Sequence, residues 1–339
     1  MPTMNNMPGI KKWLSWVGRS GQARNWAAAG LVALSATFSL LFVDRIQAPQ
    51  YVGGGATNWS PPEVVSPALA DAQLPIEVNE RIEQWMVRFT TSRQPAFEVM
   101  LSRGGLYSDM IRGKLSDRGM PEELVYLAMI ESGFHTDARS YVAATGMWQF
   151  MDPTARAYGL RIDQYVDERR DPVRATDAAL DYLSDLYQRY GSWYLAAAAY
   201  NAGPTRVSLA VARYSDGRMG DENVYWEIID HLPKETVQYV PKLLAARNLA
   251  RSAALYGLDV TLEDPYVYDL VWAPGGSSLE EVGKRMGLSD GRMRELNPQL
   301  IRGVTPPGGV YPLRVPVGQA YTAMSALAGH DLRSRLADD

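Results

Sequence analysis

Glu131 is the residue of this 339-residue chain that is best placed for acid–base chemistry. It falls near the end of a helix that we expect to start at Pro121 and to stop at Gly133. A carboxylate there faces the negative pole of the helix dipole, and Leu127 and Ala128, one turn earlier, are apolar. Both effects disfavour the charged form, so we predict a raised pKa for Glu131, which suits a general acid near neutral pH. The competing interpretation is an exposed glutamate without a role.

Three further patterns with polar residues at fixed positions follow Glu131-Ser132 in the chain. Gln149 lies in the first, Gly146-Met-Trp-Gln-Phe-Met151. Tyr200 and Asn201 end an alanine-rich helix in the second, Ala199-Tyr-Asn-Ala-Gly203. The third, Glu235-Thr-Val-Gln-Tyr-Val-Pro-Lys242, belongs to the helix that closes this part of the chain. One such motif is weak, but the four together in this order are specific.

Together these motifs resemble the lytic transglycosylases of the goose-lysozyme-like family, glycoside hydrolase family 23, and in particular their membrane-bound D branch. The resemblance implies an enzyme that cleaves the MurNAc-β-1,4-GlcNAc bond of peptidoglycan without water and leaves 1,6-anhydromuramyl products. Family members use a single glutamate, here Glu131, first as acid toward the glycosidic oxygen and then as base toward the C6 hydroxyl of muramic acid. The proximity of that hydroxyl replaces an enzymic nucleophile.

The resemblance also implies roles for the residues around the glutamate. Tyr200 would hydrogen-bond the catalytic carboxyl, Gln149 and Asn201 would contact the glycan, and Ser132 would help to hold the sugar. Glu235 and Tyr239 would line the groove from the closing helix. The chain departs from the family at Ala143-Ala144, where a Gly-Ala pair is usual, so the loop before Gly146 is expected to be tighter or shifted.

A second carboxylate, which hydrolytic glycosidases normally need, has no convincing candidate. Asp167, Glu168 and Asp171 lie in Asp-Glu-Arg-Arg-Asp-Pro, whose mixed charges are typical of a solvated turn. The chain has no cysteine and three scattered histidines, so neither disulfides nor a zinc site are expected, and we predict no cofactor. A net charge of −4 argues against nucleic acid as a partner and leaves peptidoglycan glycan strands as the expected one.

The N-terminal 46 residues read as a cytoplasmic stub followed by a membrane segment. The uncharged run from Trp26 to Val43 follows basic residues, which predicts a cytoplasmic N-terminus, export of the rest and an anchor in the cytoplasmic membrane. A cleaved signal peptide is the alternative. Residues 47–75, rich in Gly, Pro and Ser, read as a flexible linker.

The remaining chain is expected to be mainly α, with two parts. Residues 76–262 show helical periodicity throughout and predict a lysozyme-like catalytic domain. Residues 263–320 predict a strand–helix–helix–strand order, with Ser278 and Ser289 as helix caps, and resemble a LysM module that binds N-acetylglucosamine-containing glycans. A degenerate module that only packs on the enzyme is the alternative. Residues 321–339 form a tail that is helical or frayed.

We therefore expect an exported lytic transglycosylase at the periplasmic face of the cell envelope. Two alternatives stay open at this point. One is a muramidase that hydrolyses the same bond with water, and the other is a non-catalytic protein that binds the cell wall.

Overall fold

The computed structural model describes residues 73–337, with side chains up to residue 328. Contacts divide the chain into residues 1–61 and residues 62–339, so every described residue belongs to the second unit. The predicted membrane segment Trp26–Val43 and residues 47–72 of the predicted linker lie outside the described residues.

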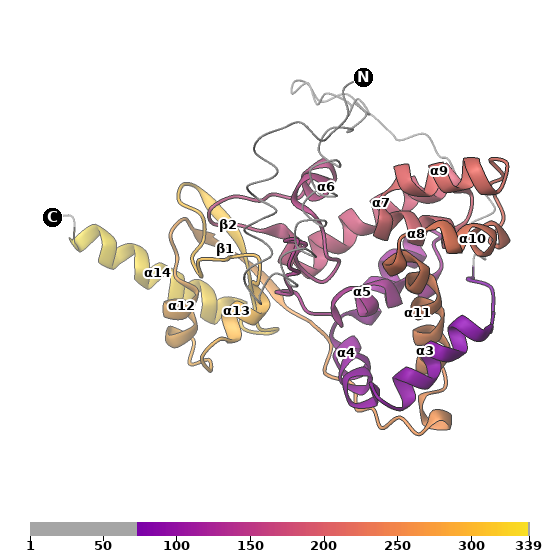
Figure 1. Cartoon of the computed structure of the whole chain (residues 1–339). Coiled ribbons are helices and arrows are strands. Elements are labelled where there is room, and N and C mark those ends of the chain that lie inside the picture. The colour runs from indigo at the N-terminus through magenta and orange to yellow at the C-terminus, as the bar shows by residue number, and fades with distance from the viewer. Residues whose placement is uncertain (1–72, 338–339) are drawn as a thin grey trace, which may run out of the picture. The chain divides into compact units, whose positions relative to one another are not determined.

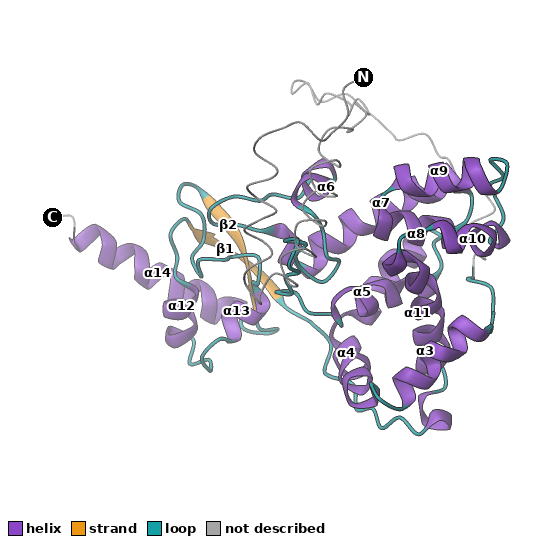
Figure 2. Cartoon of the chain, in the orientation of Figure 1, coloured by secondary structure: helices purple, strands orange, loops and turns teal. Residues whose placement is uncertain are grey.

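Residues 80–256 are built from helices joined by loops, including the long segment 133–151 between α5 and α6 (Figure 2). The α-helices of this part are α3 (Glu80–Thr90), α4 (Gln94–Asp117), α5 (Val125–Ser132), α6 (Asp152–Ala157), α7 (Pro172–Tyr190), α8 (Trp193–Ala202), α9 (Pro204–Tyr214), α10 (Asn223–Ile228) and α11 (Lys234–Ala250). Short 3₁₀ turns lie between some of them: η1 (Glu122–Leu124), η2 (Glu168–Arg170), η3 (Ile229–His231) and η4 (Ala253–Tyr256).

Helix α8 lies at the centre of the large hydrophobic core. Its four alanines, residues 196–199, are fully buried, and the small side chains allow α7, α9 and α11 to pack closely against it. Helix α5 packs against α4 on one side and against α11 on the other (Figure 1). Nearly every residue of α5 is buried, because it is apolar around its whole circumference. This arrangement fixes the C-terminal end of α5, which carries Glu131, next to α11.

Helix boundaries differ from the sequence expectations in physically simple ways. Pro121 caps the 3₁₀ turn η1 rather than starting the α-helix, which begins at Val125. Gly133 ends α5 as predicted, in the left-handed conformation with a φ of 61°. Leu74 and Pro75 lie within the stretch predicted as linker, but Leu74 is already buried in the core. The buried side chain of Arg247 fixes this stretch, because it donates hydrogen bonds to the carbonyls of both residues.

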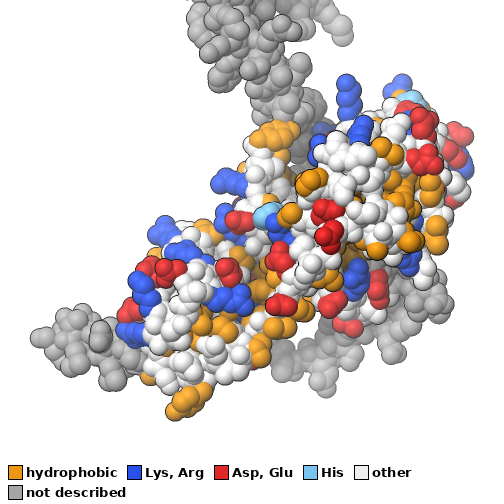
Figure 3. All heavy atoms as spheres, turned by 90° about the horizontal axis from the view of Figure 1, so that it is seen from below, with side chains coloured by type: hydrophobic (Ala, Val, Ile, Leu, Met, Phe, Trp, Pro, Cys, Tyr) orange, Lys and Arg blue, Asp and Glu red, His pale blue; other side chains and the backbone are white. Residues whose placement is uncertain are grey.

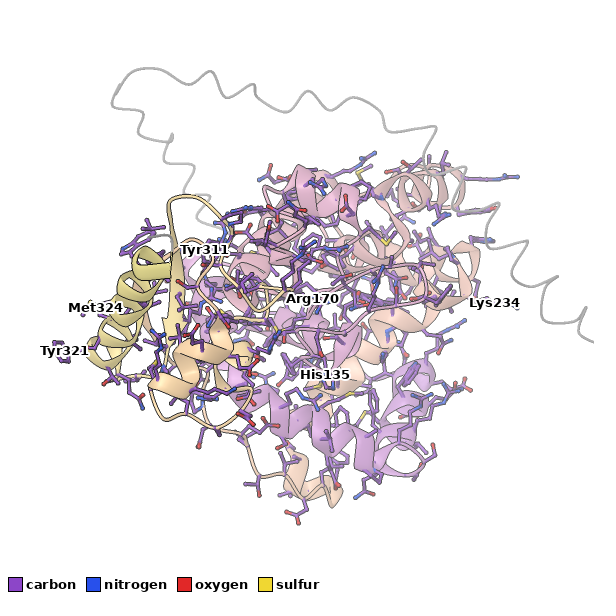
Figure 4. The ribbon with its side chains drawn as sticks, turned by 90° about the vertical axis from the view of Figure 1, so that its left-hand side faces the viewer. His135, Arg170, Lys234, Tyr311, Tyr321 and Met324 are labelled. Atoms are coloured by element: carbon purple, nitrogen blue, oxygen red, sulfur yellow. The ribbon has the colours of Figure 1, made fainter. Side chains whose placement is uncertain are left out.

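A second, smaller hydrophobic core forms around a two-stranded sheet near the C-terminus. Strands β1 (Asp269–Pro274) and β2 (Val310–Val315) pair antiparallel, with Val271 opposite Leu313. Between and after the strands lie α12 (Leu279–Arg285), α13 (Arg292–Leu296) and α14 (Ala320–Ala337). The βααβ order agrees with the predicted one, and the tail is helical and packs on β1 through Ala323 and Leu327. Tyr321 and Met324 project outward from α14 (Figure 4).

The two caps predicted for this small part have different outcomes. Ser278 caps α12, since its hydroxyl accepts a hydrogen bond from the backbone N–H of Glu281. The prediction for Ser289 was wrong, because α13 starts only at Arg292 and Gly291, in the left-handed conformation, precedes it.

The acidic segment that was predicted to be a solvated turn is buried, so this expectation was wrong. Asp167 and Asp171 are only 7% and 3% exposed. Asp167 pairs with Arg169. Asp171 caps α7, and each of its two carboxylate oxygens lies 2.8 Å from Arg314 Nη2 of β2, which donates to both. The smaller core covers this segment, because Gln299 and Ile301 form backbone hydrogen bonds with Asp167 and Tyr165. Val166 lies between them and is part of the smaller core.

Charged side chains of both signs are interspersed on the face shown in Figure 3. The prediction of a mainly α chain with a small α+β part is confirmed. Among residues 73–337, helices long and apolar enough to traverse a bilayer are not found.

Candidate active site

Glu131 is the penultimate residue of α5, and the helix end is held firmly. The backbone N–H of Gly133 donates to Met129 O at 2.8 Å, and Arg103 of α4 donates to the carbonyl of Gly133. A Cβ atom at Gly133 would lie 2.9 Å from Met100 Cγ, so glycine is required both for its φ and for the space. The position of the Glu131 backbone is therefore set by contacts with α4.

Two side chains from α11 reach the end of α5. The Tyr239 hydroxyl donates to Glu131 Oε1 at 2.5 Å, and Lys242 Nζ donates to Ile130 O at 2.8 Å. Lys242 also lies 5.8 Å from the centre of the Trp85 ring. One aromatic hydroxyl and one cation thus approach the carboxyl from the same helix face, because Tyr239 and Lys242 are three residues apart.

The environment raises the pKa of Glu131 to about 7. Burial is the main cause, since it disfavours the charged carboxylate, and the nearby Glu235 adds to it. The hydrogen bond from Tyr239 and the charge of Lys242 act in the opposite direction. Burial likewise lowers the pKa of Lys242 and raises that of Tyr239. The raised pKa of Glu131 was predicted from its apolar neighbours and from the helix dipole, and burial is its main cause.

The loop of residues 143–150 contacts the end of α5 and Tyr200 through its backbone. Ser132, next to Glu131, donates through its hydroxyl to Met147 O at 2.9 Å. The Tyr200 hydroxyl donates to Trp148 O at 2.8 Å. The prediction that Tyr200 hydrogen-bonds the catalytic carboxyl was therefore wrong, because Tyr239 occupies that place. The pKa of Tyr200 is raised mainly by burial, and the charge of the nearby Glu131 raises it further.

Gln149 adopts the left-handed backbone conformation, with a φ of 49°. Its side-chain amide donates to Gly146 O at 2.7 Å, which leaves its oxygen without a hydrogen-bond partner among the described residues. Gly146 has no room for a side chain, because a Cβ atom there would lie 1.8 Å from Arg169 O. The loop therefore presents a free amide oxygen beside Trp148 and Phe150, which are both buried.

Asn201 and Glu235 meet at the start of α11. Asn201 Nδ2 donates to Glu235 Oε1 at 3.2 Å, and the Thr236 hydroxyl donates to Asn201 Oδ1 at 2.8 Å. Glu235 itself is exposed and its charge acts on Glu131, so the pair lies close to the candidate acid.

The structure brings the predicted site residues together in one place. Six of them keep partial or full exposure, namely Glu131, Ser132, Gln149, Tyr200, Asn201 and Glu235, whereas Tyr239 is buried. Lys242 and Arg169 were not predicted to take part. The spacing of Lys242 to Tyr239 was a usable signal, whereas nothing in its local sequence distinguishes Arg169 from a surface arginine. Among residues 73–337, clusters of side chains suited to hold a metal ion are not found.

Comparison with known proteins identifies the part of the chain that carries this site. Residues 110–219 match the family model described as "Transglycosylase SLT domain". This stretch holds Glu131, Gln149, Tyr200 and Asn201, so the chain contains a transglycosylase SLT domain.

Individual relatives agree with that assignment. The chain is 32% identical over 229 residues to membrane-bound lytic murein transglycosylase D of Escherichia coli strain K12, an alignment that covers 67% of this chain and 50% of the relative. It is 40% identical over 83 residues to peptidoglycan transglycosylase gp16 of Escherichia phage T7, covering 24% of this chain and 6% of the phage protein. The chain thus spans half the length of its enterobacterial relative.

Two solved structures are also similar. The lytic transglycosylase Slt of Pseudomonas aeruginosa has a TM-score of 0.35 and 27% identity, covering 43% of this chain and 24% of that one. The 70-kDa soluble lytic transglycosylase of Escherichia coli has a TM-score of 0.37 and 22% identity, covering 53% and 32%.

Proposed function

We propose that this protein is a lytic transglycosylase that cleaves the MurNAc-β-1,4-GlcNAc bond of peptidoglycan, with Glu131 as its catalytic acid and base. The observation that carries the proposal is the carboxyl with a pKa of about 7, bonded to Tyr239 and placed within an SLT domain. A carboxyl with that pKa is partly protonated at neutral pH, so it can donate a proton and, once ionised, accept one.

In the proposed reaction Glu131 protonates the glycosidic oxygen while the bond from that oxygen to C1 of the muramic acid breaks. The resulting carboxylate then takes the proton of the C6 hydroxyl as this oxygen attacks C1, which closes the 1,6-anhydro ring and restores the acid. Tyr239 and Lys242 stabilise the ionised form between the two steps, because one donates a hydrogen bond and the other supplies a positive charge. Gln149 and Asn201 are proposed to contact the glycan.

The test is replacement of Glu131 by Gln, with exposed Glu122→Gln on the preceding turn as the matched control. Each protein is incubated with purified peptidoglycan, and the products are analysed by mass spectrometry. Glu131→Gln is expected to lower the release of anhydromuropeptides by about 10²–10⁴-fold, the usual contribution of general acid–base catalysis, while Glu122→Gln retains activity. Undiminished anhydromuropeptide release by Glu131→Gln would contradict the proposal.

A muramidase is the second candidate, and the position of Glu235 favours it. This exposed carboxylate acts on Glu131 and could serve as a base for water, as a second carboxylate does in inverting glycosidases. Digestion in water enriched in ¹⁸O separates the two reactions. Lytic transglycosylation leaves unlabelled anhydro ends, whereas hydrolysis leaves reducing muramic ends that carry the heavy isotope.

The setting of the enzyme is proposed from its relatives and its sequence. The name of the enterobacterial relative includes "membrane-bound". Together with the run Trp26–Val43, it supports an exported protein of the cell envelope that is anchored at the periplasmic face. Residues 76–262 are proposed to be the catalytic domain, and residues 263–320 a LysM-like module that binds glycan. Fractionation of cells that express the full chain tests the anchor. An anchored protein is expected to sediment with the membranes.

A further inference from the structure

Arg169 is a buried arginine that packs against the loop bearing Gln149. Its Nε and Nη2 atoms bind the two carboxylate oxygens of Asp167 at 2.9 Å and 2.8 Å, and both side chains are only 10% exposed. Its remaining terminal nitrogen, Nη1, lies 3.3 Å from Ala143 O and 3.4 Å from Phe150 O. The guanidinium therefore joins the two ends of one loop to a buried carboxylate.

The loop needs such support, because its backbone is strained at two places. Ala143 and Gln149 both adopt positive φ values, 65° and 49°, although neither is glycine. Strained residues of this kind persist only where the surrounding structure fixes them. Thr145 and Phe150 close the loop with a reciprocal pair of backbone hydrogen bonds, and Arg169 holds it from outside.

The same loop connects to the candidate active site at three points. The carbonyl of Met147 accepts from Ser132, and the carbonyl of Trp148 accepts from Tyr200. The third point is Gln149 itself, which follows Trp148 directly and is held within the loop by its bond to Gly146 O. By contrast, the groups that tune the carboxyl directly, Tyr239 and Lys242, belong to α11 and do not depend on the loop.

We propose that Arg169 is a positioning residue of the active site, which holds the loop of residues 143–150 so that Gln149 faces the glycan beside Glu131. The inference rests on the proposed transglycosylase function. Asp167 orients the guanidinium through its paired hydrogen bonds and neutralises its charge. Since neither residue reaches the Glu131 carboxyl, their effect on the reaction passes through Gln149 and its neighbours.

The experiment is a double-mutant cycle on the full chain that combines Arg169→Met with Gln149→Ala. Arg169→Met alone is expected to lower kcat/KM for anhydromuropeptide release by about 10–100-fold, the effect of misplacing a binding group by about 1 Å. On the Gln149→Ala background the same change is expected to cost less than about 3-fold, because the group it positions has been removed. Exposed Arg174→Met, on the adjoining helix, is the matched control and retains wild-type activity.

Two further readouts separate positioning from a loss of folded protein. Arg169→Met is expected to raise KM as well as lower kcat, whereas a smaller folded fraction lowers only the apparent kcat. The pH at which activity falls is expected to stay at its wild-type value, because Tyr239 and Lys242 are untouched. If Arg169→Met does not fold, the cycle is run with Arg169→Lys, which keeps the charge beside Asp167 but has three N–H donors and so cannot make all four hydrogen bonds of the guanidinium.

Equal fold-losses on the two backgrounds, or wild-type kcat/KM in both Arg169 variants, would overturn the inference. Failure of the proposed function has a different signature. In that case the wild-type protein itself releases no anhydromuropeptides, whatever residue occupies position 169.

Discussion

At the scale of single residues, the candidate site is defined by opposing influences on one carboxyl. Burial raises the pKa of Glu131, while Tyr239 and Lys242 limit the rise to about 7. A carboxyl with an ordinary pKa would be ionised at neutral pH and could not donate a proton. A carboxyl buried without these two partners would stay protonated and serve poorly as a base in the second step. The two residues of α11 therefore set the pH range in which one group can perform both steps of the proposed reaction.

Removing either partner is expected to move the working range toward alkaline pH. In Tyr239→Phe the hydrogen bond that lowers the pKa of Glu131 is lost, and in Lys242→Met the favourable charge is lost. Both changes raise the pKa of Glu131, so the acid stays protonated to higher pH and the alkaline fall in activity shifts upward. The rate of anhydromuropeptide release, measured across pH 5–9, checks this.

The control for these variants is Lys234→Met. Lys234 is an exposed lysine at the start of the same helix and lies at the periphery in Figure 4. Its replacement is expected to leave the profile unchanged. A downward shift in either active-site variant would show that the assigned influences on the carboxyl are wrong.

At the scale of elements, the loop of residues 143–150 carries strain that its sequence explains. The resemblance described in the sequence analysis implies glycine at the position of Ala143, and Ala143 adopts a positive φ of 65°. Ala143 thus adopts a backbone conformation that favours glycine, at a steric cost of about 1–2 kcal/mol for a residue with a Cβ atom. The sequence expectation of a tighter or shifted loop had not anticipated that an alanine would adopt the glycine conformation.

Ala143→Gly is therefore expected to stabilise the protein, by about 0.5–1 kcal/mol after the greater freedom of glycine in the unfolded chain is subtracted. Ala144→Gly is the matched comparison. Ala144 is buried and has no positive φ, so its replacement is expected to destabilise the protein by about 1 kcal/mol. Thermal unfolding of both variants measures the difference, and equal melting temperatures would show that Ala143 is not strained.

Sequence reasoning succeeded where local chemistry decides the structure. The end of α5 followed from Gly133, and the position of Glu131 followed from that end. The same reasoning failed where distant segments decide. Asp167 and Asp171 look solvated in their own sequence but are buried, and residues 299–314, which are distant in the chain, bond to both of them. Sequence reasoning also could not decide which tyrosine binds the Glu131 carboxyl. Tyr200 and Tyr239 both lie near Glu131, but the orientation of their helices leads the Tyr239 hydroxyl to the carboxyl and the Tyr200 hydroxyl to Trp148 O.

At the scale of the whole described chain, a buried ion pair connects the two hydrophobic cores. Arg314 of β2 binds both carboxylate oxygens of Asp171, with the side chains 9% and 5% exposed, and its guanidinium lies 4.9 Å from the centre of the Tyr268 ring. Asn297 holds the backbone of Arg314 through both its amide nitrogen and its oxygen. Asp171 thus holds the side chain of Arg314, and Asn297 holds its backbone.

Breaking this pair is expected to destabilise the protein strongly. Arg314→Met leaves Asp171 buried without its counter-ion, which costs about 3–5 kcal/mol and lowers the melting temperature by roughly 10 °C. Arg292→Met, at an exposed ion pair with Glu295, is expected to change stability by less than about 0.5 kcal/mol. Differential scanning calorimetry of both variants checks the contrast, and similar melting temperatures would mean that the ion pair does not hold the cores together.

Val166 belongs to the helical part of the chain by position but contributes its side chain to the smaller core. A graft that moved only residues 263–337 onto another protein would therefore carry away a core with one of its members missing. Protein engineers who wish to transplant this segment need to bring Val166, which forms an isolated β-bridge with Leu300, from the donor or design a replacement into the host.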